Sequence, residues 1–164
     1  MKRVFSQLTK STLFASLLFA TIFLFSNCSK NEAGLSGTLT YSVSGNASPN
    51  QAVPANNSGG SGTFTGTYDA STKIMSYTTT WTNLSGAPIS GGLFAGVTGQ
   101  VGTSITVWPL GSGLSSSGSF SSSTTLNADQ ESKLLTGKTY YVLGTAANAS
   151  GEIRGQITAQ ANND

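Results

Sequence analysis

Apolar and polar residues alternate with a period of two over most of the chain from Leu35 onward. Successive side chains of a β-strand point to opposite faces, so this alternation predicts half-buried strands. Threonine, valine and aromatic residues, which dominate these segments, suit the pleated surface of a sheet. The predicted strands cover residues 35–43, 63–68, 75–81, 89–97, 104–108, 119–126, 138–145 and 152–160.

Stretches rich in Gly, Ser, Asn and Pro separate these strands and predict turns or loops at residues 44–62, 68–72 and 110–118. Eight short strands joined by polar turns are typical of an antiparallel Greek-key β-sandwich or barrel. We therefore expect an all-β domain over residues 35–160, followed by a short tail at residues 161–164. Its fold would be immunoglobulin-like.

One segment predicts a short helix, near residues 128–136, within the all-β domain. Asn127 is a good N-cap residue, and two acidic residues follow it in the first turn, where the helix dipole favours them. Gly137 suits the left-handed backbone that commonly ends a helix. We expect Leu134 and Leu135 to pack this helix against the sandwich.

The N-terminal segment has its own pattern: three basic residues, an apolar run over residues 12–25 and then Cys28, the only cysteine. A membrane-spanning helix needs about 20 apolar residues, whereas the core of a secretory signal peptide needs about 7–15 after positive charge. The arrangement resembles a bacterial lipoprotein signal peptide, similar to those of Bacteroidetes. The resemblance implies cleavage of residues 1–27, lipidation of Cys28 with fatty acids such as palmitate, and a short tether at residues 28–34. The alternative is a retained signal anchor.

Removal of this leader changes the charge of the protein. The full chain has eight basic and six acidic residues, but three of the basic residues lie in the leader. The mature chain is therefore close to neutral, and its composition does not indicate a nucleic-acid partner. We expect a membrane partner through the lipid on Cys28, a location in the cell envelope at the outer membrane, and either an envelope protein or a glycan as a further ligand. The periplasmic and the surface-facing leaflets both stay open.

The chemistry of the mature chain is narrow, because it contains no histidine and no cysteine beyond Cys28. Zinc sites built from Cys and His and a Ser-His-Asp triad are therefore excluded. We expect no cofactor, no metal, no catalytic residues and a non-enzymatic binding or structural module. A carboxylate-based enzyme is an alternative, and it predicts that Asp69, Asp129 or Glu152 converges in a pocket with Arg154.

Three residues are candidates for binding. Glu152 and Arg154 are next-but-one neighbours in a predicted strand, so they face the same side and could form an ion pair or bind a ligand. A structural ion pair beside the core is the favoured interpretation. Trp108 is opposite in phase to Ile105 and Val107, which makes it a candidate for an exposed ring that stacks on a sugar. Trp81, in contrast, alternates with core positions, and we expect it to be buried.

The C-terminal third carries a more specific motif. The segment L-T-G-K-T-Y-Y-V-L-G-T at residues 135–145 is followed by N-A-S-G-E-I-R-G-Q-I at residues 148–157. Together they resemble the C-terminal half of a CHRD (chordin-type) domain, in which a tyrosine strand precedes a G-E-I-R-G-Q-I strand. Weaker similarity extends the resemblance to residues 35–157.

The chain departs from this family at three positions. The family usually carries a His-x-His pair in its central strand and a further histidine in the tyrosine strand. These positions correspond to Gly92, Phe94 and Gly144 here. The resemblance therefore implies the fold of the family, which is similar to that of Cu/Zn superoxide dismutase, without the nitrogen ligands for a metal.

Overall fold

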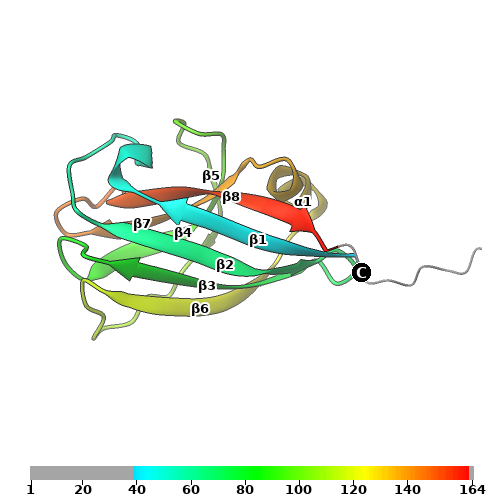
Figure 1. Ribbon diagram of the computed structural model, residues 1–164, viewed down its shortest axis with the longest axis horizontal. Helices are drawn as coiled ribbons and strands as arrows, with labels where there is room; N and C mark the ends of the chain where they lie inside the picture. Colours follow the sequence, from blue (N-terminus) through cyan, green and yellow to red (C-terminus); the bar gives the residue numbers. More distant parts are fainter. Residues whose placement is uncertain (1–38, 163–164) are drawn as a thin grey trace, which may run out of the picture. The chain divides into compact units, whose positions relative to one another are not determined.

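The computed structural model describes residues 39–162, which form eight β-strands, one 3-10 helix and one α-helix (Figure 1). The predictions about the leader, Cys28 and the tether lie outside the described residues. The elements, in chain order, are β1 (Thr40–Ala47), η1 (Pro49–Gln51), β2 (Ser61–Asp69), β3 (Ile74–Thr82), β4 (Pro88–Ala95), β5 (Thr103–Val107), β6 (Gly118–Thr125), α1 (Ala128–Leu135), β7 (Thr139–Thr145) and β8 (Ile153–Ala161).

The strands form one antiparallel sheet in the order β5-β4-β7-β8-β1-β2-β3-β6, which curls into a nearly closed sandwich (Figure 1). Strand β8 joins the two halves: its residues 153–157 pair with β7, and its residues 158–161 pair with β1. The open edges of the sheet are β5 and β6. The expectation of an all-β antiparallel sandwich or barrel with one short helix is confirmed.

The core lies between the two halves of the sheet and is rich in aromatic rings. Phe64 stacks on Tyr77 with ring centroids 5.0 Å apart, and it also contacts Tyr141 at 5.3 Å. Trp81 is buried as predicted, and its indole N–H donates to the carbonyl of Ser115 at 3.0 Å. Burial of aromatic rings of this size supplies much of the hydrophobic stabilisation of a small domain.

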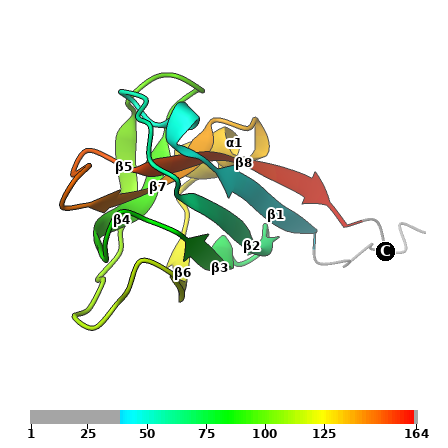
Figure 2. The ribbon, with the colours of Figure 1, turned by 60° about the vertical axis from the view of Figure 1, so that its left-hand side comes forward.

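The helix α1 covers one end of the sandwich (Figure 2). Its N-terminus is a capping box, in which Asn127 and Gln130 each accept a hydrogen bond from the backbone N–H of the other. Gly137 has φ +69° after the last turn, as expected for the helix end. Leu134 is fully buried, but Leu135 is 37 % exposed, so the prediction that both leucines pack the helix is wrong for Leu135. Adjacent helical positions point about 100° apart, and only one of them can face the core here.

The first strand ends later than its sequence pattern predicted. Strand β1 continues beyond Val43 to Ala47, and the turn-rich segment that follows contains the helix η1. The composition of residues 44–47 (Ser, Gly, Asn, Ala) is typical of a loop, but pairing with β2 on one side holds all four in the sheet. Between residues 39 and 162, no helix is long and apolar enough to cross a membrane.

Candidate functional site

The outer surface of β2, β3 and β6 carries an ordered array of hydroxyl groups, which we call the hydroxyl face. Each strand contributes the side chains of alternate residues, and all but the half-buried Thr78 are exposed. The hydroxyl face consists of Ser61, Thr63, Thr65, Thr67, Ser76, Thr78, Thr80, Thr82, Ser119, Ser121, Ser123 and Thr125.

The strand register aligns these hydroxyls in rows across the sheet. Thr65 pairs with Thr78, and Thr78 pairs with Ser121, so three hydroxyls lie side by side. Thr78 and Ser121 share a hydrogen bond of 2.8 Å, and Thr63 and Thr80 share one of 2.7 Å. A hydroxyl offers one donor and two acceptor sites, so each of these groups keeps further hydrogen-bonding capacity for a partner outside the sheet.

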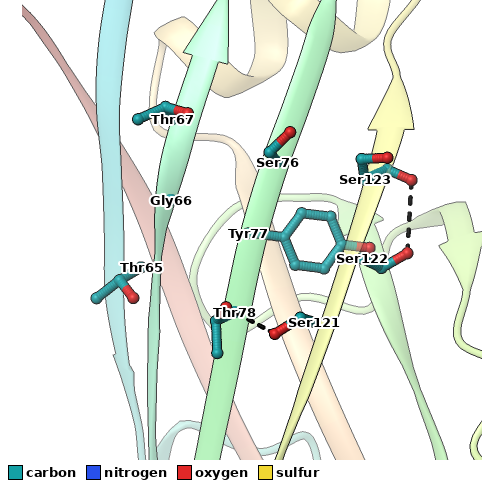
Figure 3. Close-up of a pocket in the computed structure, with 9 residues that line it drawn as sticks. All are labelled: Thr65, Gly66, Thr67, Ser76, Tyr77, Thr78, Ser121, Ser122 and Ser123. Atoms are coloured by element: carbon teal, nitrogen blue, oxygen red, sulfur yellow. Dashed lines mark hydrogen bonds between the residues drawn. The ribbon is translucent and has the colours of Figure 1, made fainter.

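A shallow trough of about 630 Å³ runs across the middle of the hydroxyl face (Figure 3). Thr65, Thr78 and Ser121 lie on one side of it, with further hydroxyls from the same three strands around them. Gly66 lies in its floor, where a Cβ atom would overlap the backbone carbonyl of Ser76 on the neighbouring strand β3. The trough therefore offers many neutral donors and acceptors over a contact area suited to an extended ligand.

The three strands under the hydroxyl face contain a single charged residue, Asp69, at the very end of β2. Its carboxylate accepts hydrogen bonds from the backbone N–H and the hydroxyl of Ser71, which close the β2–β3 turn. The Ser71 hydroxyl contributes most to holding the pKa of this carboxyl below its usual value. Asp69 thus acts in the turn, and the rest of the face is electrically neutral.

Glu152 is a fully buried carboxylate whose partners are hydroxyls and a backbone N–H. It accepts hydrogen bonds from the N–H of Ser85 at 2.7 Å, from the Ser85 hydroxyl and from the Thr145 hydroxyl. Burial raises the pKa of this carboxyl, but these hydrogen bonds outweigh burial and hold the pKa below its usual value. Glu152 therefore joins the loop after β3 to the end of β7.

Arg154 is also buried, and it binds a different part of the structure. Its guanidinium donates to the carbonyl of Gln100 at 2.7 Å and to that of Val97 at 2.8 Å. It also lies 3.5 Å above the centre of the Tyr140 ring, a favourable position for a cation. Burial lowers the pKa of the guanidinium, and Tyr140 opposes that effect.

Glu152 and Arg154 do not form the predicted ion pair. Among residues 39–162, the ion pairs join Lys73 to Glu131 and Lys133 to Asp129. Strand β8 begins at Ile153, so Glu152 precedes the regular strand and its side chain turns toward Ser85, away from Arg154. Glu152 therefore binds the loop after β3, and Arg154 binds the loop after β4.

The acidic residues of the alternative enzyme hypothesis do not converge. A Cβ atom on Gly60 would lie 3.2 Å from the Glu152 carboxylate, which places Glu152 beside the start of β2. Asp69 is at the far end of this strand, about 30 Å away at 3.3 Å per residue. Asp129 lies on α1 and pairs with Lys133. No group of three or more metal-ligating side chains occurs in the described part of the chain.

Trp108 is not an exposed stacking platform, so this prediction is wrong. It is 4 % exposed, whereas its neighbour Val107 is 67 % exposed. The indole N–H donates to the Tyr77 hydroxyl at 2.9 Å, and its ring lies 5.3 Å from that of Phe120. Trp108 follows the last residue of edge strand β5 and fills the core toward β6, which the local alternation of residues does not reveal.

The positions that carry histidines in the resembling family lie on the outer face of β4 and β7. Phe94 stacks on Tyr140 with ring centroids 5.5 Å apart. Gly92 lies against the backbone of Thr106, and a Cβ atom at Gly144 would lie 2.8 Å from the carbonyl of Ala149. The space around the two glycines is therefore occupied by backbone.

The pattern of the sequence does not predict the hydroxyl face as a candidate site. Alternating Ser and Thr residues are typical of the solvated side of an antiparallel sheet. The feature of the sequence that could have indicated the hydroxyl face is that three such strands are free of charged residues. These strands are at residues 61–67, 76–82 and 119–125. The three strands lie side by side because β6 pairs with β3, although β4 and β5 lie between them in the sequence. The periodicity of a sequence does not determine which strands pair.

These observations define an antiparallel β-sandwich domain with two buried charged residues, Glu152 and Arg154, and a neutral hydroxyl face on β2, β3 and β6. The CHRD domain family model matches residues 43–157, so the chain belongs to the CHRD domain family. No curated protein and no solved structure gave a match to the chain.

Proposed function

We propose that this protein is a non-catalytic binding module of the bacterial cell envelope, held at a membrane by a lipid on Cys28. Its ligand is a neutral, hydroxyl-rich polymer, namely a glycan, which binds along the hydroxyl face. The observation that carries the proposal is the alignment of twelve Ser and Thr side chains on three strands with a trough across their middle.

The charge distribution supports a neutral partner. Glu152 and Arg154 are buried, and the two lysine–carboxylate pairs neutralise most of the remaining charge. An anionic or cationic polymer would have no opposite charge to meet on β2, β3 and β6 apart from Asp69. Hydroxyl groups, in contrast, match the donors and acceptors of a sugar chain one by one. Single contacts of this kind are weak, so an extended chain that engages several rows is the favoured ligand.

The leader supports the location. Its apolar run over residues 12–25 and the cysteine at position 28 resemble a lipoprotein signal peptide. A lipid on Cys28 would leave a short polar segment before β1, so the domain would work close to the membrane surface. Many copies on one membrane would add their weak glycan contacts together.

The binding test is co-sedimentation of the lipidated protein, in detergent, with insoluble polysaccharides of different charge. We expect the protein to bind neutral glucans and to bind acidic polymers only weakly. Binding to neutral glucans should not decrease between about 50 mM and about 500 mM salt, because salt screens only the interactions between charges. A triple variant, T65V/T78V/S121A, removes the central row of hydroxyls while it keeps side-chain volume and strand propensity similar. Its dissociation constant should rise about ten-fold or more, because three lost contacts of about 0.5 kcal/mol each add up to about 1.5 kcal/mol.

The matched control is T103V/S104A, which changes two exposed hydroxyl residues on β5, away from the hydroxyl face. This control should bind as the unchanged protein does. Binding that disappears in salt, or that is equal in the triple variant, would contradict the proposed ligand and the proposed surface.

The anchor is tested separately by metabolic labelling of cells with a palmitate analogue. We expect label on the unchanged protein, none on a Cys28→Ala variant, and a shift of that variant out of the membrane fraction. Protease treatment of intact cells then distinguishes the surface-facing leaflet from the periplasmic one. A Cys28→Ala variant that stays labelled and membrane-bound would refute the lipid anchor.

A further inference from the structure

A small pocket of about 90 Å³ lies beside the buried Arg154 on the outer face of β4, β7 and β8. It is distinct from the hydroxyl face, which β2, β3 and β6 form. Its walls are mainly apolar and come from the segment after η1, from β4 and β7, and from the loop after β4. The apolar residues are Ala52, Val53, Phe94, Val101 and Val142.

Arg154 is the charged group of this pocket, and it is only 3 % exposed. A guanidinium has five N–H donors, and two of them bind the carbonyls of Gln100 and Val97. The Tyr140 ring covers one face of the group at 3.5 Å. Two of its five donors therefore have hydrogen-bond partners among the described residues. No carboxylate among these residues pairs with its positive charge.

A buried cation without a counter-ion is costly, because carbonyl dipoles and an aromatic face replace only part of the hydration that the charge has lost. A carboxylate matches a guanidinium through two parallel charge-assisted hydrogen bonds. The ion pairs in residues 39–162 do not involve Arg154, so the chain itself supplies no such partner in the described region. The pocket beside Arg154 is the place from which one could come.

We propose that this pocket binds a small organic monocarboxylate, with its carboxylate on Arg154 and a short alkyl chain against the valine and phenylalanine walls. A pocket of about 90 Å³ limits the ligand to a few heavy atoms, which suits an acid of two or three carbons. A single guanidinium balances one negative charge, so a divalent anion such as phosphate is disfavoured. Inorganic chloride would leave the apolar walls unused.

The test measures the melting temperature of the lipidated protein in detergent with sodium propionate, sodium chloride, sodium phosphate or propionamide at equal ionic strength. We expect propionate alone to raise it, by about 5 °C when the ligand is at about ten times its Kd. Propionamide has the same shape without the charge, and chloride has the charge without the alkyl chain. An equal effect of propionate and chloride would overturn the proposal.

Substitutions at Val101 test the site without disturbing the core, since this residue is 76 % exposed at the pocket wall. Val101→Glu supplies a carboxylate from the chain itself, so it should raise the melting temperature and abolish the response to propionate. Val101→Gln, which is neutral and similar in size, should keep a response. Val107→Glu adds the same charge to the exposed strand β5 and is the matched control. If the Val101→Glu variant responds to propionate as the Val107→Glu variant does, the carboxylate site is refuted.

Discussion

The buried carboxylate of Glu152 should be one of the most sensitive positions of the fold. Three donors converge on it: the Ser85 N–H, the Ser85 hydroxyl and the Thr145 hydroxyl. Hydrogen bonds to a charged group each contribute about 1.5–3 kcal/mol, and a buried donor without a partner costs about 1–3 kcal/mol. Glu152→Ala removes the acceptor and leaves a cavity, so it should lower the free energy of unfolding by about 3–5 kcal/mol.

The substitution Glu152→Gln removes the negative charge of the side chain but keeps its size and shape, so it measures the contribution of the charge alone. The amide oxygen can still accept from the Ser85 N–H, and the two hydroxyls can rotate to accept from the amide NH₂ group. Only the charge-assisted part of the hydrogen bonds is then lost, which should cost about 1–2 kcal/mol. Asp129→Asn is the control, because that carboxylate is exposed and its pair with Lys133 contributes about 0–1 kcal/mol.

The effect should also depend on pH. The pKa of Glu152 is lower in the folded protein than its ordinary value of 4.5, because the hydrogen bonds that favour the ionised form outweigh the burial that opposes it. Stability from this group is therefore fully present above pH 4.5 and is lost as the pH falls through the folded-state pKa. The difference between the unchanged protein and Glu152→Gln should narrow in acid.

The assay is urea unfolding followed by the fluorescence of Trp81 and Trp108, both of which are buried in the folded domain. Measurements at pH 7 and at about pH 3.5 bracket the ordinary pKa of the carboxyl. A Glu152→Ala cost below about 1 kcal/mol would refute the view that Glu152 holds the two segments together. A Glu152→Gln difference that stays constant or widens in acid would refute the argument from ionisation.

Three further substitutions test other parts of the structure, each by urea unfolding. Trp108→Phe removes the hydrogen bond to the Tyr77 hydroxyl and should cost about 1–3 kcal/mol without changing co-sedimentation with neutral glucans; lost glucan binding in a folded variant would contradict the core position of Trp108. Asn127→Ala removes the N-cap of α1 and should cost about 1 kcal/mol, and no measurable cost would mean that the capping box is not formed in solution. Gly151→Ala should cost about 1–3 kcal/mol, because φ is +136° there and a Cβ atom would lie 2.7 Å from a methyl group of Val142; an unchanged or higher stability would contradict this backbone conformation.

Period-two alternation predicted the strands because it is a local property of the backbone. Phe64 and Tyr68, for example, are both buried on the face that their alternation with threonines indicated. The helix α1 could also be predicted from the sequence, since the residues that indicate its ends, Asn127 and Gly137, lie beside the helix itself. In both cases the information is contained in a few consecutive residues.

The predictions for Glu152, Arg154 and Trp108 were wrong because the positions of these side chains depend on contacts between distant segments. The pairing of Glu152 with Arg154 was expected from their spacing, but Ser85 and Thr145 draw Glu152 to one side and the loop at residues 97–100 binds Arg154 on the other. These partners belong to other strands and loops, and nothing in the motif itself indicates them. The burial of Trp108 likewise depends on Tyr77 and Phe120, more than ten residues away along the chain.

The three positions at which the resemblance to the family implies histidines lie on the outer face of β4 and β7. Phe94 stacks on Tyr140, and Tyr140 carries the guanidinium of Arg154 on its ring. A histidine at Gly144 would have its Cβ 2.5 Å from the Ser90 hydroxyl, so the turn at residues 146–150 would have to move before an imidazole could fit. Because these groups pack on one another, a single substitution to histidine would not create a nitrogen-ligand site. This face is an aromatic stack around a buried cation, and the uncompensated charge of Arg154 is the reason for the carboxylate ligand proposed for the apolar pocket beside it.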